Sequence, residues 1–246
     1  ASSAGSPVAA EALYKLGFGQ LQAEGFAAAE VTLEALTTRH TDSELFGEAL
    51  FLLGEARYRQ GDFAGAVEPL ERLTTKLPDH AVAHKARFRL GLALGELGRF
   101  GECERTLARL VKDQPNFANL AEAELWRGRA LAGQGKARAA RQAFDRCMAR
   151  DASTGAGVLS ARARLGLGQL AEAEQRYDEA LSEYLKVAVL FTDDEAVAEA
   201  LLRAGGCLER LDDAPNALLR YREVVDKHPD SSSFDAARTA ARRLGS

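Results

Sequence analysis

Small and apolar residues recur along the chain at steps of three and four positions, which is the spacing of one face of an α-helix. One segment shows the pattern clearly, with Phe63, Ala66, Leu70 and Leu73 in succession. Ala, Leu, Glu and Arg dominate the composition, and these residues lose little conformational freedom in a helix. The pattern therefore predicts a chain built from short helices.

The glycines reveal a longer period in the sequence. Six of them share one frame, with steps of 37 residues and a single step of 40: Gly17, Gly54, Gly91, Gly128, Gly168 and Gly205. An alanine stands five positions before each of these glycines, and a large apolar residue stands sixteen positions after it. The large residues are Leu33, Leu70, Leu107, Phe144, Tyr184 and Tyr221. Agreement in residue size across six copies predicts an internal repeat of 37 residues.

Each copy of the repeat has the pattern of two helices joined by a turn. In the second copy the turn contains Gly61, and glycine can adopt the left-handed conformation that ends a helix. The second helix stops at Pro78, because proline cannot continue a helix, and Asp79 can cap the next one. One such hairpin cannot bury its apolar face alone, so we expect the hairpins to stack into a continuous core.

The second copy carries the fullest set of repeat residues: Ala49, Phe51, Leu53, Gly54, Gly61, Asp62, Phe63, Ala66, Leu70, Leu73 and Pro78. This set resembles the tetratricopeptide repeat, a helical hairpin of about 34 residues. The resemblance covers residues 8–230 and implies an all-α, right-handed solenoid of about six hairpins. The longer unit and its Pro-Asp exit are similar to repeats of bacterial envelope proteins, such as the Tol-Pal coordinator and the outer-membrane assembly lipoproteins.

This frame predicts the organisation of the whole chain. We expect a disordered lead-in at 1–7, hairpins at 8–43, 44–80, 81–117, 118–156, 157–194 and 195–230, and a capping helix at 231–246. The fourth hairpin lacks the exit proline and carries an insertion at 153–157, so a looser junction is expected there. The capping helix is expected to turn Arg238, Arg242 and Arg243 toward solvent.

The charges are nearly balanced, with 32 basic and 36 acidic residues interspersed along the chain. No basic excess or stripe is present, so a nucleic-acid partner is not expected. No apolar run of about 18 residues occurs, so no membrane span is expected. The small-residue start of the chain is typical of an exported mature protein and compatible with a lipid anchor on its precursor. We therefore expect a periplasmic or cell-envelope location rather than a cytoplasmic one.

The sequence contains no constellation of residues that indicates catalysis. Cys103, Cys147 and Cys207 fall at positions where other copies have small or buried residues, so we expect them to fill the core. His80 and His84 share a helix face, but a zinc site needs further ligands and a typical motif, and we expect two solvated side chains. Nucleotide-binding and nucleophile motifs are also missing. We predict no enzyme activity and no cofactor.

A partner-binding surface is implied by the family resemblance, because the first helices of tetratricopeptide hairpins line a concave groove that usually takes a peptide or a helix. Matching positions place these residues on or near the groove: Tyr14, Phe51, Glu55, Tyr58, Phe88, Leu125 and Arg129. Trp126 is added because its counterparts in the other copies are mostly polar, and tryptophan is enriched in interface hot spots. The alternative is that these aromatic residues pack between hairpins and that Trp126 lies in the core.

The sequence favours a non-catalytic scaffold that binds a protein or peptide partner in a bacterial envelope complex. Two alternatives stay open: a cytoplasmic regulatory or ligand-sensing module, and the repeat segment of a larger multidomain protein. The sequence identifies neither the partner nor the oligomeric state.

Overall fold

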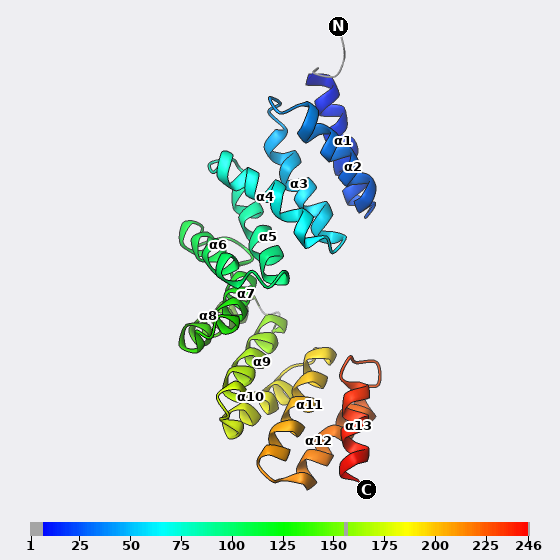
Figure 1. Cartoon of the computed structure of the whole chain (residues 1–246), viewed down its shortest axis with the longest axis vertical. Coiled ribbons are helices and arrows are strands. Elements are labelled where there is room, and N and C mark those ends of the chain that lie inside the picture. The colour runs from blue at the N-terminus through cyan, green and yellow to red at the C-terminus, as the bar shows by residue number, and fades with distance from the viewer. Residues whose placement is uncertain (1–6, 155–156, 246) are drawn as a thin grey trace. The chain divides into compact units, whose positions relative to one another are not determined.

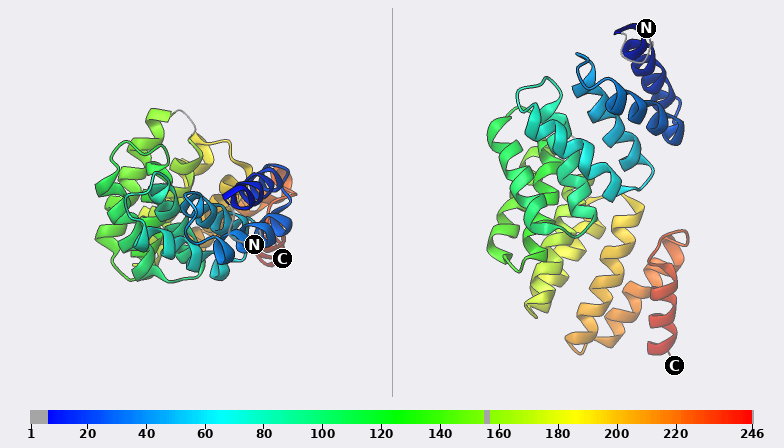
Figure 2. Two further views of the ribbon diagram at one scale, coloured as in Figure 1. Left: turned by 90° about the horizontal axis from the view of Figure 1, so that it is seen from above. Right: turned by 45° about the horizontal axis from the view of Figure 1, so that its top comes forward.

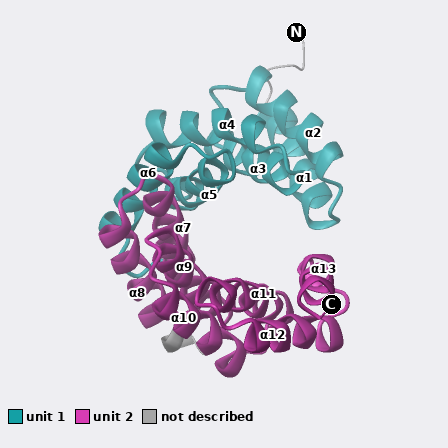
Figure 3. Cartoon of the chain, turned by 60° about the horizontal axis from the view of Figure 1, so that its bottom comes forward, with its two compact units in different colours: residues 1–117 teal, residues 118–246 magenta. Residues whose placement is uncertain are grey.

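The computed structural model describes residues 7–154 and 157–245, and these residues form thirteen α-helices and no strand (Figure 1). The chain forms two compact units, residues 1–117 and residues 118–246 (Figure 3). Each unit is a stack of helical hairpins, which confirms the predicted all-α hairpin solenoid.

The first unit contains three hairpins. Its helices are α1 (Pro7–Gln22), α2 (Phe26–Arg39), α3 (Phe46–Arg59), α4 (Phe63–Lys76), α5 (Ala83–Glu96) and α6 (Phe100–Asp113). Each helix packs against the next one in the chain, and α3 also contacts α1 and α5. The first helices of the hairpins, α1, α3 and α5, therefore form one side of the unit, and the second helices form the other (Figure 3). α1 begins at Pro7, which we had assigned to the lead-in, because proline suits the first position of a helix.

The second unit contains three further hairpins and a final helix. Its helices are α7 (Leu120–Gly133), α8 (Ala137–Thr154), α9 (Val158–Ala173), α10 (Tyr177–Leu190), α11 (Asp194–Arg210), α12 (Ala214–Lys227) and α13 (Phe234–Leu244). α13 packs on α12 and α11 at the end of this stack (Figure 2). Its three arginines are exposed, as predicted, and Arg243 pairs with Glu209 on α11 at 2.7 Å.

The repeat glycines mark the closest approach of the two helices in every hairpin. A Cβ atom added to Gly54 would lie 2.5 Å from Cγ of Leu70, and one added to Gly128 would lie 2.5 Å from Cδ1 of Phe144. The other four repeat glycines face the large residue sixteen positions later in the same way. The glycine and the large residue thus form one packing unit, which explains why both recur in the sequence.

The turn inside each hairpin uses one left-handed residue, seven positions after the repeat glycine. Gly61 fills this position in the second hairpin with φ of +79°. Three hairpins place a residue with a side chain there, and Glu24, Gln175 and Asp212 have φ values of 57°, 58° and 58°. Left-handed backbone is costly for such residues, so these turns are held by the hairpin packing rather than by local preference.

The helices on either side of the junction after the fourth hairpin, where we expected a looser connection, are linked by hydrogen bonds. α8 continues to Thr154 because no proline stops it, so the first part of the insertion is helical. The carboxylate of Asp151, which is 0% exposed, accepts hydrogen bonds from the Ser160 backbone N at 2.8 Å and from its hydroxyl at 2.6 Å. The end of α8 is therefore tied to the start of α9. Residues 155–156 lie outside the described residues.

Candidate partner-binding surface

The first-helix face of the first unit, formed by α1, α3 and α5, carries five of the predicted contact residues: Tyr14, Phe51, Glu55, Tyr58 and Phe88. The other three, Leu125, Trp126 and Arg129, lie on α7 in the second unit. Five of the predicted residues thus belong to the first unit and three to the second.

Glu55 is at the centre of a charged cluster that joins the second and third hairpins. Its carboxylate is 8% exposed and accepts hydrogen bonds from Nε of Arg59 at 2.9 Å and from a terminal nitrogen of Arg89 at 3.0 Å. The Arg89 guanidinium also lies 4.4 Å from the centre of the Tyr58 ring, within the range of a cation–π contact. Glu55 therefore orients Arg89 and Tyr58 and is itself already satisfied.

The outermost helix of this face carries exposed aromatic and apolar side chains. The rings of Tyr14 and Phe18 stack with their centres 6.3 Å apart. Phe18 is 43% exposed, and the neighbouring Leu16 is 54% exposed. Burial and the charge of Glu48 raise the pKa of Tyr14 above its ordinary value, so its hydroxyl stays a neutral hydrogen-bonding group at physiological pH. Phe18 was not among the predicted contact residues, because its counterparts in the other copies include Leu92, Gln169 and Gly206 and share no aromatic character.

Two further predicted contact residues, besides Glu55, are buried. Phe88 is 7% exposed and packs edge-on against Phe117 with ring centres 5.4 Å apart. Leu125 is 1% exposed and lies in a core cluster with Phe144 and Leu167. Both side chains stabilise the hairpin stack, which is the alternative that we had left open for this set of residues, and neither offers an apolar surface to a partner.

Trp126 is half-buried on α7, and the exposed Arg129 lies 5.1 Å from the centre of the indole one helical turn away. Tryptophan and arginine are the residue types most enriched in binding hot spots. This pair presents an aromatic surface with a positive edge on the first-helix side of the second unit.

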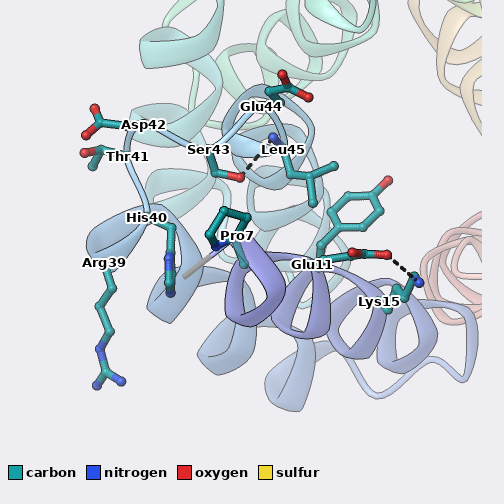
Figure 4. A pocket seen from close by; sticks show the side chains of 12 residues that line it. Pro7, Glu11, Lys15, Arg39, His40, Thr41, Asp42, Ser43, Glu44 and Leu45 are labelled. Carbon is teal, nitrogen blue, oxygen red and sulfur yellow. Dashed lines mark hydrogen bonds and ion pairs between the residues drawn. The ribbon is translucent and has the colours of Figure 1, made fainter. Parts of the chain in front are cut away.

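A cleft of about 710 Å³ lies between α1 and the segment that joins α2 to α3 (Figure 4). Its residues from α1 are Pro7, Ala10, Glu11, Tyr14 and Lys15, and its residues from the opposite side are Arg39, His40, Thr41, Asp42, Ser43, Glu44 and Leu45. The Glu11 carboxylate and the Lys15 ammonium form an ion pair at 2.7 Å on one rim. Of these residues, only Tyr14 was predicted to bind a partner.

The two neighbouring histidines are half-buried, which differs from the solvated side chains that we expected. Nε2 of His80 lies 3.2 Å from a carboxylate oxygen of Glu48, and the ring of His84 packs edge-on against Phe117 at 5.6 Å. Burial, together with the charges of Lys85 and Arg87, lowers the pKa of His84. Within the described residues no group of three or more His, Cys, Asp or Glu side chains is placed to hold a metal ion.

The three cysteines are buried in the hairpin cores and form no disulfide with one another. Burial raises the pKa of the Cys147 thiol to about 12 and that of Cys207 to about 11. Thiols with such pKa values form little thiolate at neutral pH, and the thiolate is the reactive form. Among the helices of the described residues, none combines the length and apolarity that crossing a bilayer requires.

Stacked helical hairpins with closely packed repeat glycines define an α-helical repeat protein, and comparison with protein families identifies the kind of repeat. A tetratricopeptide repeat-like domain matches residues 4–163, and a tetratricopeptide repeat matches residues 199–231. The chain therefore belongs to the tetratricopeptide repeat family. A comparison with curated proteins by sequence gives no significant match.

Several solved structures share this fold over most of their length. PilF of Pseudomonas aeruginosa is 17% identical with a TM-score of 0.65, and the alignment covers 94% of this chain and 97% of PilF. PilW, described as a widely conserved type IV pilus biogenesis factor, is 16% identical with a TM-score of 0.69, at 93% and 98% coverage. MamA of Desulfovibrio magneticus is 18% identical with a TM-score of 0.61, at 73% and 93% coverage. At these identities the likeness shows the fold.

Proposed function

We propose that this chain is a non-catalytic scaffold that binds a peptide or helix of a protein partner on the first-helix face of its first unit, within a bacterial envelope complex. The fold supports the interaction role, because stacked hairpins provide an extended surface for a partner. The envelope location rests on the similarity to PilF and PilW, of which the latter is described as a pilus biogenesis factor.

The observation that carries the proposal is the clustering of exposed and half-buried aromatic rings on two helices in contact, α1 and α3. Tyr14 and Phe18 stack on α1, and Phe51 and Tyr58 are half-buried on α3. Arg89 extends this surface from α5 through its contact with Tyr58. Amphipathic helices bind to such surfaces through apolar anchors spaced by three or four residues.

The internal contacts of Glu55 support a binding role for the side chains around it. Arg59 and Arg89 neutralise the Glu55 carboxylate, and their hydrogen bonds to it restrict the rotamers of both arginines. A binding group that is held in place before the partner arrives loses less conformational entropy on association. Glu55 is therefore a positioning residue of the proposed surface, whereas Phe18, Tyr58 and Arg89 are its contact residues.

A pull-down comparison tests the proposal with two single substitutions of similar chemistry. Phe18→Glu places a charge on the exposed aromatic cluster, whereas Val189→Glu places one at an 80% exposed position of α10, a helix of the second unit. We expect Phe18→Glu to reduce the amount of partner protein recovered in the pull-down by more than ten-fold, and Val189→Glu to leave that amount unchanged. Retention of all partners by a folded Phe18→Glu variant contradicts the proposal. Fractionation of host cells tests the envelope location independently.

A further inference from the structure

The cleft in the first hairpin occupies a position that the other hairpins of the same unit fill with a side chain. It is bordered by Ala10, seven residues before the repeat glycine Gly17, and by Ser43, 26 residues after it. Tyr14 forms a wall between them. The corresponding positions in the second and third hairpins show what this space accommodates.

In the second hairpin an imidazole ring fills the space. His80 stands 26 residues after the repeat glycine Gly54, and Gly47 stands seven residues before it. The ring lies so close to Gly47 that a Cβ atom added there would be 2.5 Å from Nε2 of His80. Nε2 of the ring lies 3.2 Å from a carboxylate oxygen of Glu48, and Nδ1 accepts a hydrogen bond from the backbone N of Val82, 3.3 Å away. Glycine and histidine thus form a complementary pair.

In the third hairpin a phenyl ring fills the same space. Phe117 stands 26 residues after Gly91 and packs edge-on against His84 at 5.6 Å and Phe88 at 5.4 Å. Phe88 corresponds to Tyr14 of the first hairpin, and it is 7% exposed. The second and third hairpins of this unit therefore place an aromatic ring beside their first helix. The first hairpin has a cleft at the corresponding place.

The first hairpin has no ring at the position of His80 and Phe117, because Ser43 is short; the ring of His40, three residues earlier, is 7% exposed and lines the cleft. The Ser43 hydroxyl accepts a hydrogen bond from the backbone N of Leu45 at 3.2 Å and so points along its own loop. The sixth hairpin has the same pair of residue types, Ala198 and Ser231, but there the loop is joined to α11 by contacts of His228 with Asp194 and Ser232 with Glu195.

We propose that the first-hairpin cleft binds an aromatic side chain of a partner peptide, which takes the place that Phe117 and His80 take in the next two hairpins. The inference rests on the proposed peptide-binding function and specifies one anchor residue of the peptide. Tyr14 supplies an aromatic wall and Leu45 supplies apolar surface, whereas Ala10 lies behind them and is 1% exposed. The rim carries two acidic residues, Glu11 and Asp42, and two basic residues, Lys15 and Arg39. Balanced charge favours an uncharged aromatic side chain that is flanked by polar residues in the partner peptide.

The test uses two neutral tripeptides with blocked ends, Ala-Phe-Ala and Ala-Ala-Ala, added to the isotopically labelled full chain. Backbone amide shifts of Ala10, Tyr14 and Ser43 report occupancy of the cleft. We expect the phenylalanine peptide to move these signals, with an apparent affinity at least about ten-fold higher than that of the alanine peptide. Equal effects of the two peptides, or no effect at the solubility limit, overturn the proposal.

Two variants assign the effect to the cleft. Ser43→Phe supplies the missing ring from within the chain, so it is expected to abolish the shifts, whereas Ser182→Phe at an exposed position of α10 is expected to preserve them. His80→Ser removes the imidazole ring beside Gly47. The phenylalanine peptide is then expected to shift the backbone amide signals around Gly47 as well. Shifts that persist in a folded Ser43→Phe variant overturn the proposal.

Other occupants of the cleft give different results. If the signals of Ala10 and Ser43 depend on protein concentration without peptide, a second copy of the chain covers the cleft and the proposal fails. If deletion of residues 1–6 is needed before the peptide binds, the chain's own start competes for the cleft and the proposal fails in the full chain. Loss of partners in Phe18→Glu but not in Ser43→Phe keeps the proposed function and rejects the aromatic anchor.

Discussion

Gly54 on α3 packs directly against Leu70 on α4 in the second hairpin, and the leucine side chain occupies the volume in which any Cβ at position 54 would lie. That Cβ would be 2.5 Å from Cγ of Leu70, a separation that packed atoms do not tolerate. Both partners are buried, with Leu70 at 0% exposure. The relationship recurs in all six hairpins and sets how closely their two helices approach.

Substitution of Gly54 by alanine is therefore expected to destabilise the first unit despite the higher helix propensity of alanine. Overpacking of this kind costs about 1–3 kcal/mol. Gly19→Ala is the matched control, because Gly19 also lies in a helix of the first unit but has nothing within 4 Å of an added Cβ. This control should gain about 0.5–1 kcal/mol from helix propensity. Urea unfolding followed by circular dichroism measures both values, and equal effects contradict the packing argument.

The left-handed turn residues allow the opposite kind of test. Gln175 has φ of 58°, so Gln175→Gly relieves backbone strain and is expected to stabilise the second unit by about 0.5–1 kcal/mol. Gly61→Ala in the second hairpin should lose about 1 kcal/mol from the backbone alone, because an added Cβ meets nothing within 4 Å. Thermal unfolding of the two variants checks the signs. A loss of stability in Gln175→Gly indicates that the side chain makes an offsetting contact.

The hairpin fold was predictable because the residues that pack its two helices together stand at fixed positions in every repeat. A glycine and a large residue sixteen positions later must coincide wherever the two helices touch, so the pair repeats with the period of the fold. The turn position was predicted only where it holds glycine, as at Gly61. Glu24, Gln175 and Asp212 occupy the same position without a compositional signal, because tertiary packing overrides their local preference.

The exposure of the predicted contact residues was not predictable from the frame alone. Tyr14 and Phe88 occupy the same repeat position, yet Tyr14 lines an open cleft and Phe88 is 7% exposed. The difference comes from the residue 26 positions after the repeat glycine, which is Ser43 in one hairpin and Phe117 in the other. That residue meets the first helix only after the hairpin has closed, so the pairing becomes visible in the structure and not in the helical pattern.

Glu124 on α7 provides a test of buried charge in the second unit. Its side chain is 0% exposed and bonds to Arg127 at 3.0 Å and to Nε of Arg146 at 2.9 Å. Breaking a fully buried pair costs about 3–5 kcal/mol, but Arg146 is 43% exposed and can return to water. We therefore expect Glu124→Gln to lower the unfolding free energy by about 2 kcal/mol.

The matched control for Glu124→Gln is Arg238→Ala, which removes a solvent-exposed ion pair with Asp235 on α13. Such pairs contribute about 0–1 kcal/mol, so the control should unfold nearly as the parent does. Chemical denaturation followed by the fluorescence of Trp126, the only tryptophan, reports on the second unit. A Glu124→Gln variant as stable as the control shows that the buried carboxylate contributes nothing.

Alkaline pH is expected to destabilise the second unit through four buried groups. Burial raises the pKa of Cys147 to about 12 and that of Cys207 to about 11, and burial followed by hydrogen bonding to glutamate raises the pKa of Tyr184 and Tyr221. A folded-state pKa above the unfolded value means that the unfolded chain releases its protons first. The contribution of these groups is therefore complete below pH 9 and is lost progressively between about pH 9 and pH 12.

The change is measured as the urea midpoint of Trp126 fluorescence at pH 8 and pH 10.5, where we expect a loss of about 1–3 kcal/mol at the higher pH. Cys207→Ala isolates one contribution, because alanine occupies the same repeat position at Ala56, Ala93 and Ala130 and preserves the small side chain. The variant should lose less stability on going to pH 10.5 than the parent. If the two proteins have the same pH dependence, other groups cause the loss of stability and Cys207 does not contribute to it.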